Sequence, residues 1–215
     1  SNVPGVGKNL QDHTFVDVWS PPLRNQNISM PNPVLGGWGA VAIEENGEHY
    51  YVLTIDEMNG VKAIRIFVET FHYKSRGTVK LRDKHPLSDP LIDPHYLSNT
   101  YDEKKLVATV KLGRSFFSTK VMSSLTESVL MEMSPGYNMT DDQQILEWAK
   151  TKASTDYHPS STCKMGKNFK NDPMIVVDKR LRVRNTKHLR IADASIIPTL
   201  ISGNPNQITM IIGFK

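Results

Sequence analysis

The sequence predicts an α+β fold with a mostly antiparallel sheet and flanking helices. Three observations support this prediction. Alternating apolar patterns typical of strands occur within residues 49–82, and helical patterns occur within residues 101–152. The apolar segments that follow residue 172 are again short and strand-like. Strands, then helices, then strands again favour an α+β arrangement with a mostly antiparallel sheet.

The composition limits the classes of protein to consider. The chain has 215 residues, of which 39% are hydrophobic and 22% charged, so it is long enough for a real core and is not globally disordered. A single cysteine excludes a disulfide framework and a multi-cysteine metal site. No stretch approaches the roughly 20 apolar residues of a membrane span. The net charge is +4, and the basic residues are scattered, so we expect no nucleic-acid binding.

The first third of the chain mixes loops and strands. Residues 4–13 (PGVGKNLQDH) predict a Pro/Gly turn that enters a short helix. Residues 20–37 contain four prolines and few periodic apolar residues, which is typical of an extended loop or a lid. Residues 49–55 and 61–69 are β-rich, and the second segment has an apolar face formed by Ile64, Ile66 and Val68.

The middle of the chain predicts one more strand and then two helices. Residues 75–82 alternate, with Gly77 suited to a bulge or a turn, and the prolines that follow exclude a helix interior. Residues 101–118 carry an apolar helical stripe. Thr140 and Gln143 fit a capping box for a helix over residues 141–152.

The last quarter returns to short strands. Residues 174–177, 181–183 and 188–192 are each apolar and short enough for a strand. Residues 206–215 are apolar and predict the opening of a helix. No internal repeat is visible.

His158 is the strongest single candidate for a catalytic group. Pro159 restricts the backbone at His158 to extended values, and small residues follow. A general base must titrate near working pH and be held in place, which histidine does best. The alternative is a histidine on a surface loop.

Cys163, five residues on, has no thiol-protease pattern around it and is expected to be a small buried hydrophobe.

Two further segments have residues suited to ligand binding. Residues 202–207 (SGNPNQ) predict a tight turn before the final helix, where Asn206 could form a hydrogen bond and free N–H groups could face a ligand. Asp193-Ala194-Ser195 offers a carboxylate and small residues that could meet a ligand backbone or a ribityl hydroxyl. The alternatives are an ordinary capped turn in each case. No G-x-G-x-x-G or P-loop occurs, and no spacing assembles a metal site.

Several phrases occur in one fixed order along the chain. They are Gly5-Val6-Gly7-Lys8-Asn9-Leu10-Gln11-Asp12-His13, Ser75-Arg76-Gly77-Thr78-Val79, Pro90-Leu91-Ile92-Asp93-Pro94, His158-Pro159-Ser160 through Gly166, and Asp193-Ala194-Ser195 with Ser202-Gly203-Asn204-Pro205-Asn206. This order resembles the glucose–methanol–choline (GMC) oxidoreductases, flavoenzymes that oxidise alcohols. The resemblance runs from residue 4 to residue 215. The sequence around His158 is most similar to that of choline dehydrogenases and related alcohol dehydrogenases.

The resemblance implies a function and a division into domains. Residues 1–20 would leave an FAD domain, residues 21–170 would form a shortened substrate-binding domain, and residues 171–215 would be the C-terminal part of the FAD-binding domain. The implied reaction is the FAD-dependent oxidation of an alcohol to an aldehyde or ketone by hydride transfer to flavin N5. It implies His158 as the general base and Asn206 as its partner, with the cofactor contacts at Asp193, Ala194, Asn206 and Gln207.

The chain also departs from the family pattern. The dinucleotide fingerprint that binds the ADP half of FAD is absent, and the stretch between His13 and Ser75 is shorter than usual. We therefore expect a C-terminal portion whose partners are a small alcohol and an N-terminal FAD domain, in cis or in trans. The alternative is a non-catalytic GMC-like module with a binding or structural role.

Overall fold

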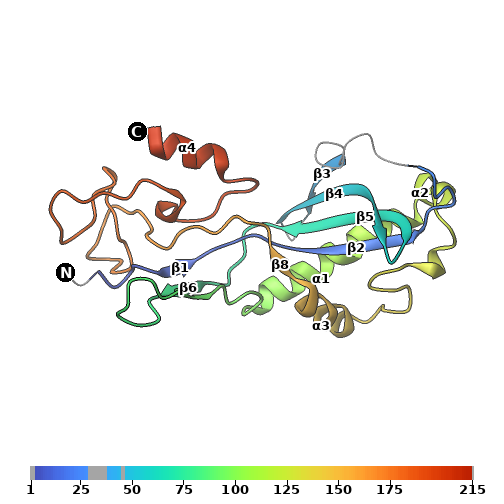
Figure 1. The fold of residues 1–215 in the computed structure, drawn as a ribbon, viewed down its shortest axis with the longest axis horizontal. Helices are drawn as coiled ribbons and strands as arrows, with labels where there is room; N and C mark the ends of the chain where they lie inside the picture. Colours follow the sequence, from blue (N-terminus) through green and yellow to red (C-terminus); the bar gives the residue numbers. More distant parts are fainter. Residues whose placement is uncertain (1–2, 29–37, 45–46, 215) are drawn as a thin grey trace. The chain divides into compact units, whose positions relative to one another are not determined.

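The computed structural model describes residues 3–28, 38–44 and 47–214. The chain forms two compact units, each assembled from segments that are far apart in the sequence (Figure 1). The sheet unit contains Thr14–Phe71 and Thr100–Ser154. The terminal unit contains the three remaining segments, Ser1–His13, His72–Asn99 and Thr155–Lys215.

The sheet unit is built on a five-stranded sheet in the order β3-β4-β5-β2-β8. Its strands are β3 (Trp38–Glu44), β4 (Gly47–Met58), β5 (Val61–Thr70), β2 (Thr14–Pro22) and β8 (Ser154–Thr155). The pairs β3/β4, β4/β5 and β2/β5 are antiparallel, which confirms the predicted sheet. The predicted strands over 49–55 and 61–69 lie within β4 and β5.

Several strands were not predicted from the sequence, among them β2 and β3. β2 includes Ser20, Pro21 and Pro22, so the predicted loop over 20–37 was wrong at its start. The two prolines are accommodated because the β2/β5 register shifts between Trp19 and Pro22, where the regular ladder ends. β3 begins directly after the predicted loop, and residues 29–37 of that loop lie outside the described residues.

The core of the sheet unit lies between the sheet and the longest helix. Val16 pairs with Val68 and Val18 with Ile66, and all four side chains are fully buried. This helix is α1 (Thr100–Ser115), and Gly113 allows it to lie close to β5. A Cβ added at Gly113 would lie only 3.1 Å from the Val68 side chain. Ile64, Ile66 and Val68 are buried together, which confirms the predicted apolar face of β5.

The helices of the sheet unit are α1 (Thr100–Ser115), η1 (Phe116–Ser118), α2 (Lys120–Leu125), η2 (Val129–Met131) and α3 (Asp142–Lys152). The two helices predicted for this unit, over 101–118 and 141–152, are confirmed, whereas α2 and η2 were not predicted. Figure 1 shows α1 and α3 side by side on one face of the sheet. The predicted capping box at Thr140 was wrong: Asp141 caps α3, and its carboxylate accepts hydrogen bonds from the Gln143 and Gln144 N–H groups.

The terminal unit contains a small antiparallel sheet in the order β1-β6-β7. The strands are β1 (Lys8–Leu10), β6 (Gly77–Lys80) and β7 (Leu91–Asp93). The short helix predicted within residues 4–13 was therefore wrong, because those residues form a turn and then β1. Close packing requires two glycines of the motifs: a Cβ would lie 2.0 Å from the Val79 carbonyl oxygen at Gly7 and 2.2 Å from the Asp93 carbonyl oxygen at Gly77.

The strands predicted at 174–177, 181–183 and 188–192 were also wrong. These residues form only the isolated bridges Met165/Val177, Val177/Val183 and Arg182/Arg190. Leu181, Asn185 and His188 take positive φ angles of 65°, 58° and 60°, which turn the chain too often for a continuous ladder. The segment is nevertheless buried, through a cluster formed by Val176, Val177, Leu181, Val183 and Ile196.

The chain ends in η3 (Ala194–Ile196) and α4 (Asn206–Phe214). The predicted C-terminal helix is thus confirmed. α4 is apolar but has no buried residue, and Met210, Ile211 and Phe214 are 61%, 64% and 96% exposed. In the part of the chain that the structure describes, no helix has the length and apolar character needed to cross a membrane.

Candidate active site

His158 lies in the terminal unit, on the loop that follows β8, and is only 8% exposed. Its backbone is fixed by the N-terminal segment. The His158 N–H donates to Asp12 Oδ1 at 3.0 Å, and the backbones of Gln11 and Ser160 exchange hydrogen bonds of 2.8 and 3.1 Å. The surface-loop alternative for His158 is therefore wrong, because the side chain is buried and its loop is anchored on both sides.

Asp12 is the centre of the polar network that holds this loop. Its Oδ2 atom accepts hydrogen bonds from the Tyr96 hydroxyl at 2.5 Å and from the Thr155 hydroxyl at 2.6 Å. Burial, and next the hydrogen bond to Asp12, raise the pKa of Tyr96 above its ordinary value, so Tyr96 remains a hydrogen-bond donor. Asp12 thus connects β1, the loop around Tyr96 and the His158 loop.

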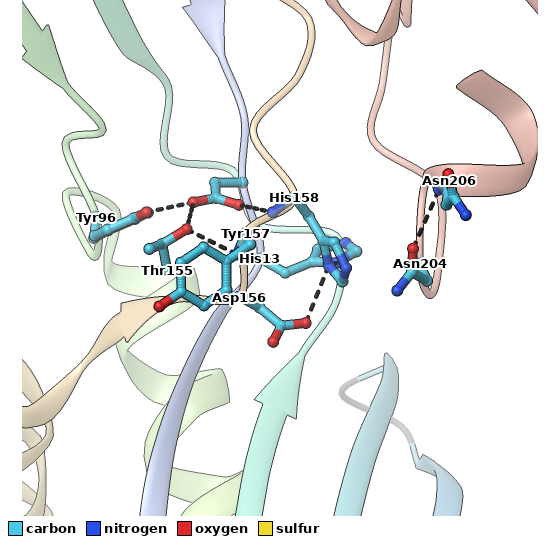
Figure 2. A network of polar contacts seen from close by, with 9 residues as sticks. His13, Tyr96, Thr155, Asp156, Tyr157, His158, Asn204 and Asn206 are labelled. Atoms are coloured by element: carbon cyan, nitrogen blue, oxygen red, sulfur yellow. Dashed lines mark hydrogen bonds and ion pairs between the residues drawn. The ribbon is translucent and has the colours of Figure 1, made fainter. Parts of the chain in front are cut away.

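The imidazole of His158 faces a second histidine and a carboxylate. His158 Nδ1 lies 3.0 Å from His13 Nδ1 and 3.0 Å from Asp156 Oδ2. The two rings are almost perpendicular, at 89°, with their centroids 5.1 Å apart. Figure 2 shows the three side chains converging from the end of the N-terminal segment and from the loop after β8.

Burial keeps both histidines neutral at ordinary pH. Desolvation lowers the pKa of His13 to about 4, against the opposing effect of Asp156 and Asp12. Burial also lowers the pKa of His158, and the neighbouring His13 adds to that effect while Asp156 opposes it. A neutral imidazole can accept a proton, which is the state that a general base requires.

The turn before α4 approaches the same cluster. The backbone of Ile201, at the start of this turn, raises the pKa of His13, although less than burial lowers it. Asn206 and Gln207 are both exposed, at the first turn of α4. Asn204 Oδ1 accepts a hydrogen bond from the Asn206 N–H at 3.2 Å, which links the two amide residues of the turn (Figure 2). The turn therefore presents two amide side chains, of which the sequence predicted only Asn206.

A pocket of about 600 Å³ brings two of the four predicted cofactor residues, Asp193 and Ala194, close to the His158 loop, whereas Asn206 and Gln207 line a separate pocket. The lining of the first pocket includes Pro159 and Ser160 together with Asp193 and Ala194. Backbone hydrogen bonds join the two segments, from the Ser161 N–H to the Ala194 carbonyl and from the Cys163 N–H to the Ser195 carbonyl. The Asp193 carboxylate accepts a hydrogen bond from the Ser195 N–H at 2.8 Å and so caps η3, as the alternative interpretation expected.

Two other features, a further pocket and Cys163, do not bring the predicted site residues together. A larger pocket of about 790 Å³ in the sheet unit is lined by residues of 130–151, none of them a predicted site residue. Cys163 is half-buried beside the Val176 cluster, and burial raises the pKa of its thiol. A thiol with a raised pKa is a poor nucleophile, in agreement with the expected structural role.

Sequence reasoning missed His13, Asp12 and Asp156 as site residues. Asp12 and His13 end the first of the ordered motifs, and Asp156 precedes His158 by two residues. All three residues therefore lie in or next to a part of the sequence that was already singled out. His13 and His158 are 145 residues apart in the chain, and only the fold brings them together.

Comparisons with known proteins identify the family of the chain. The family model described as GMC oxidoreductase matches residues 74–213. The chain is 32% identical to an alcohol dehydrogenase (acceptor) of Pseudomonas putida, covering 98% of this chain and 43% of that protein. It is also 32% identical to the mitochondrial choline dehydrogenase of Mus musculus, covering 100% of this chain and 40% of the relative.

Solved structures show the same fold. A pyridoxine 4-oxidase from Mesorbium loti superimposes with a TM-score of 0.82 at 23% identity, over 98% of this chain and 42% of the other. A fungal aryl-alcohol oxidase gives a TM-score of 0.79 at 19% identity, over 99% of this chain and 47% of the other. The chain spans about two fifths of the length of the curated relatives it matches.

Proposed function

The chain belongs to the GMC oxidoreductase family, and on that premise we propose that the protein containing it oxidises an alcohol with FAD. His158 accepts the hydroxyl proton of the alcohol, and the carbon loses a hydride as the carbonyl forms. The observation that carries the proposal is the buried His158, whose Nδ1 faces His13 and Asp156 and whose loop borders the pocket with Asp193 and Ala194. The family relationship does not favour the non-catalytic alternative.

The residues around the pocket fit a flavin. A volume of about 600 Å³ lies within the range of cofactor sites, and its lining combines apolar side chains with a few polar groups. Asp193 and Ala194 would meet the ribityl side, and Asn206 and Gln207 would offer backbone N–H groups at the start of α4. When bound, FAD would supply a hydride acceptor at its N5 atom.

The protein's own groups would divide the remaining chemistry. His158 Nδ1 is oriented by its two neighbours, so Nε2 is the nitrogen that would accept the alcohol proton. The Asn206 amide would hold the substrate oxygen and, unlike a second histidine, would not compete for the proton. Asn204 is an amide in the same turn and could share this role. Asn204→Ala is therefore tested beside Asn206→Ala.

Tight binding of the ADP half of FAD would require a dinucleotide-binding domain outside these 215 residues. Support comes from the absence of a G-x-G-x-x-G sequence and from the two-fifths coverage of the relatives. The exposed apolar face of α4 is suited to packing against such a domain. The assignment of residues 1–20 and 171–215 to the FAD domain and 21–170 to the substrate domain stays a prediction.

The test is alcohol-dependent flavin reduction in the full-length protein. Choline, pyridoxine and benzyl alcohol represent the substrates or classes that the relatives' names give, and each would be mixed anaerobically with the flavin-loaded protein. We expect at least one alcohol to bleach the flavin absorbance, and Asn206→Ala and Asn204→Ala to slow that step. A loaded protein that no alcohol reduces would contradict the proposal.

A further inference from the structure

Two polar groups face the same nitrogen atom at the centre of the site. His158 Nδ1 faces both His13 Nδ1 and Asp156 Oδ2, each at 3.0 Å. A neutral imidazole has one nitrogen that donates and one that accepts, and an ionised carboxylate only accepts. The position of the single His158 proton therefore decides whether the contact with Asp156 is attractive.

Only one tautomer of His158 makes its contact with Asp156 attractive. With the proton on Nδ1, His158 donates toward Asp156, and His13 Nδ1 can accept beside it when the His13 proton is on Nε2. With the proton on Nε2, the Nδ1 lone pair of His158 would face a carboxylate oxygen at 3.0 Å, which is repulsive. The carboxylate therefore selects the tautomer with the proton on Nδ1 and the lone pair on Nε2.

Asp156 is itself held in place. Its backbone N–H donates to the His13 carbonyl at 3.0 Å, so the same residue that faces His158 also anchors Asp156. Tyr157 takes a positive φ of 60°, a tight turn that lets Asp156 and His158 approach each other although they are only two residues apart. The two side chains are 20% and 10% exposed, so water screens their contact little.

We propose that Asp156 is a positioning residue that fixes the tautomer and orientation of His158, leaving the Nε2 lone pair to receive the alcohol proton. The structural part of this inference concerns the contact alone, and its catalytic consequence rests on the proposed function. Asp156 touches no reacting atom and acts only through His158.

The direct test measures the His158 tautomer by NMR of the full-length protein with ¹⁵N-labelled histidine. His158→Gln assigns the resonances, because the signals that vanish belong to that ring. We expect the wild type to carry the proton on Nδ1 and Asp156→Asn to move it toward Nε2, because the amide can donate to Nδ1. Asp156→Glu should restore the wild-type pattern, and Asp172→Asn, which alters an exposed carboxylate of the same unit, should leave it unchanged.

A second measurement follows flavin reduction in the full-length protein. Asp156→Asn should lower the limiting reduction rate on the order of 100-fold, with alcohol affinity little changed and activity regained in Asp156→Glu. A wild-type His158 with its proton on Nε2, or an Asp156→Asn variant with an unchanged tautomer, would overturn the inference. So would a switched tautomer with an unchanged rate. If no alcohol reduces the wild-type flavin, the proposed function fails, while the tautomer result still decides the role of Asp156.

Discussion

The burial of His13 makes the stability of this protein sensitive to acid. His13 is 1% exposed, and its pKa is lowered from 6.5 to about 4 in the folded state. An unfolded chain binds a proton at this residue below about pH 6.5, whereas the folded chain does not until about pH 4. The contribution of His13 is therefore fully present above pH 6.5 and is lost as the pH falls toward 4.

The size of this effect follows from the two pKa values. Between pH 7.5 and pH 5.0, His13 alone should lower the free energy of unfolding by about 2 kcal/mol. His13→Gln removes the titrating group, so the variant should lose about 2 kcal/mol less than the wild type over the same interval. The expected readout is the difference between the two pH dependences and not the absolute stability of the variant.

Urea denaturation at pH 7.5 and 5.0, followed by fluorescence and circular dichroism, measures this difference. His85→Gln is the matched control, because His85 is exposed and its loss should leave the pH dependence as in the wild type. If His13→Gln and the wild type lose equal stability between the two pH values, His13 is not buried as a neutral group and the reasoning is refuted.

Three further outcomes are expected. Cys163→Ser should keep most of the alcohol-dependent flavin reduction of the full-length protein, since the hydride mechanism gives the thiol no role; lost turnover at normal flavin content would contradict this. Gly77→Ala should cost about 2 kcal/mol or more in urea denaturation, because its Cβ would lie 2.2 Å from the Asp93 carbonyl oxygen, whereas Gly213→Ala, with no atom within 4 Å, should cost far less. The isolated chain should bind FAD weakly in a fluorescence titration and self-associate in sedimentation through the apolar face of α4; tight stoichiometric binding would contradict this.

The sequence predicted those elements whose signal is local. The alternation of Ile64, Ile66 and Val68 is a period-two pattern that any half-buried strand shows, and it lies in β5 as expected. β2 carries the equally buried Val16 and Val18, but Pro21 and Pro22 at its end obscured the pattern. Its pairing partner is about fifty residues further along the chain, so no local feature identified it.

After residue 172 the local pattern again predicted only part of the structure. Apolar residues such as Val176 and Val183 were predicted to be in strands, and they are indeed buried. They are buried in turns and single bridges, because residues with positive φ interrupt the chain. Apolar composition therefore predicted the burial of this segment but not its backbone conformation.

The candidate site was partly predictable for a similar reason. His158 and its loop follow from Pro159 and from the ordered phrases of the sequence. Its neighbours His13 and Asp12 belong to the first of those phrases, yet only the backbone pairing of Gln11 with Ser160 brings the two ends together. Asp156 had a local signal, a carboxylate two residues before a histidine, which becomes informative only once both side chains are known to be buried.

The reduction of flavin by alcohol in a His158→Ala variant tests the central claim most directly. The full-length protein would be loaded with FAD, checked for equal flavin content in wild type and variant, and mixed anaerobically with the alcohol that reduces the wild type best. Loss of a general base predicts a decrease in the limiting reduction rate on the order of 10²–10⁴-fold. A variant that retains full flavin and reduces it at a near-normal rate would contradict the assignment of His158 as the base.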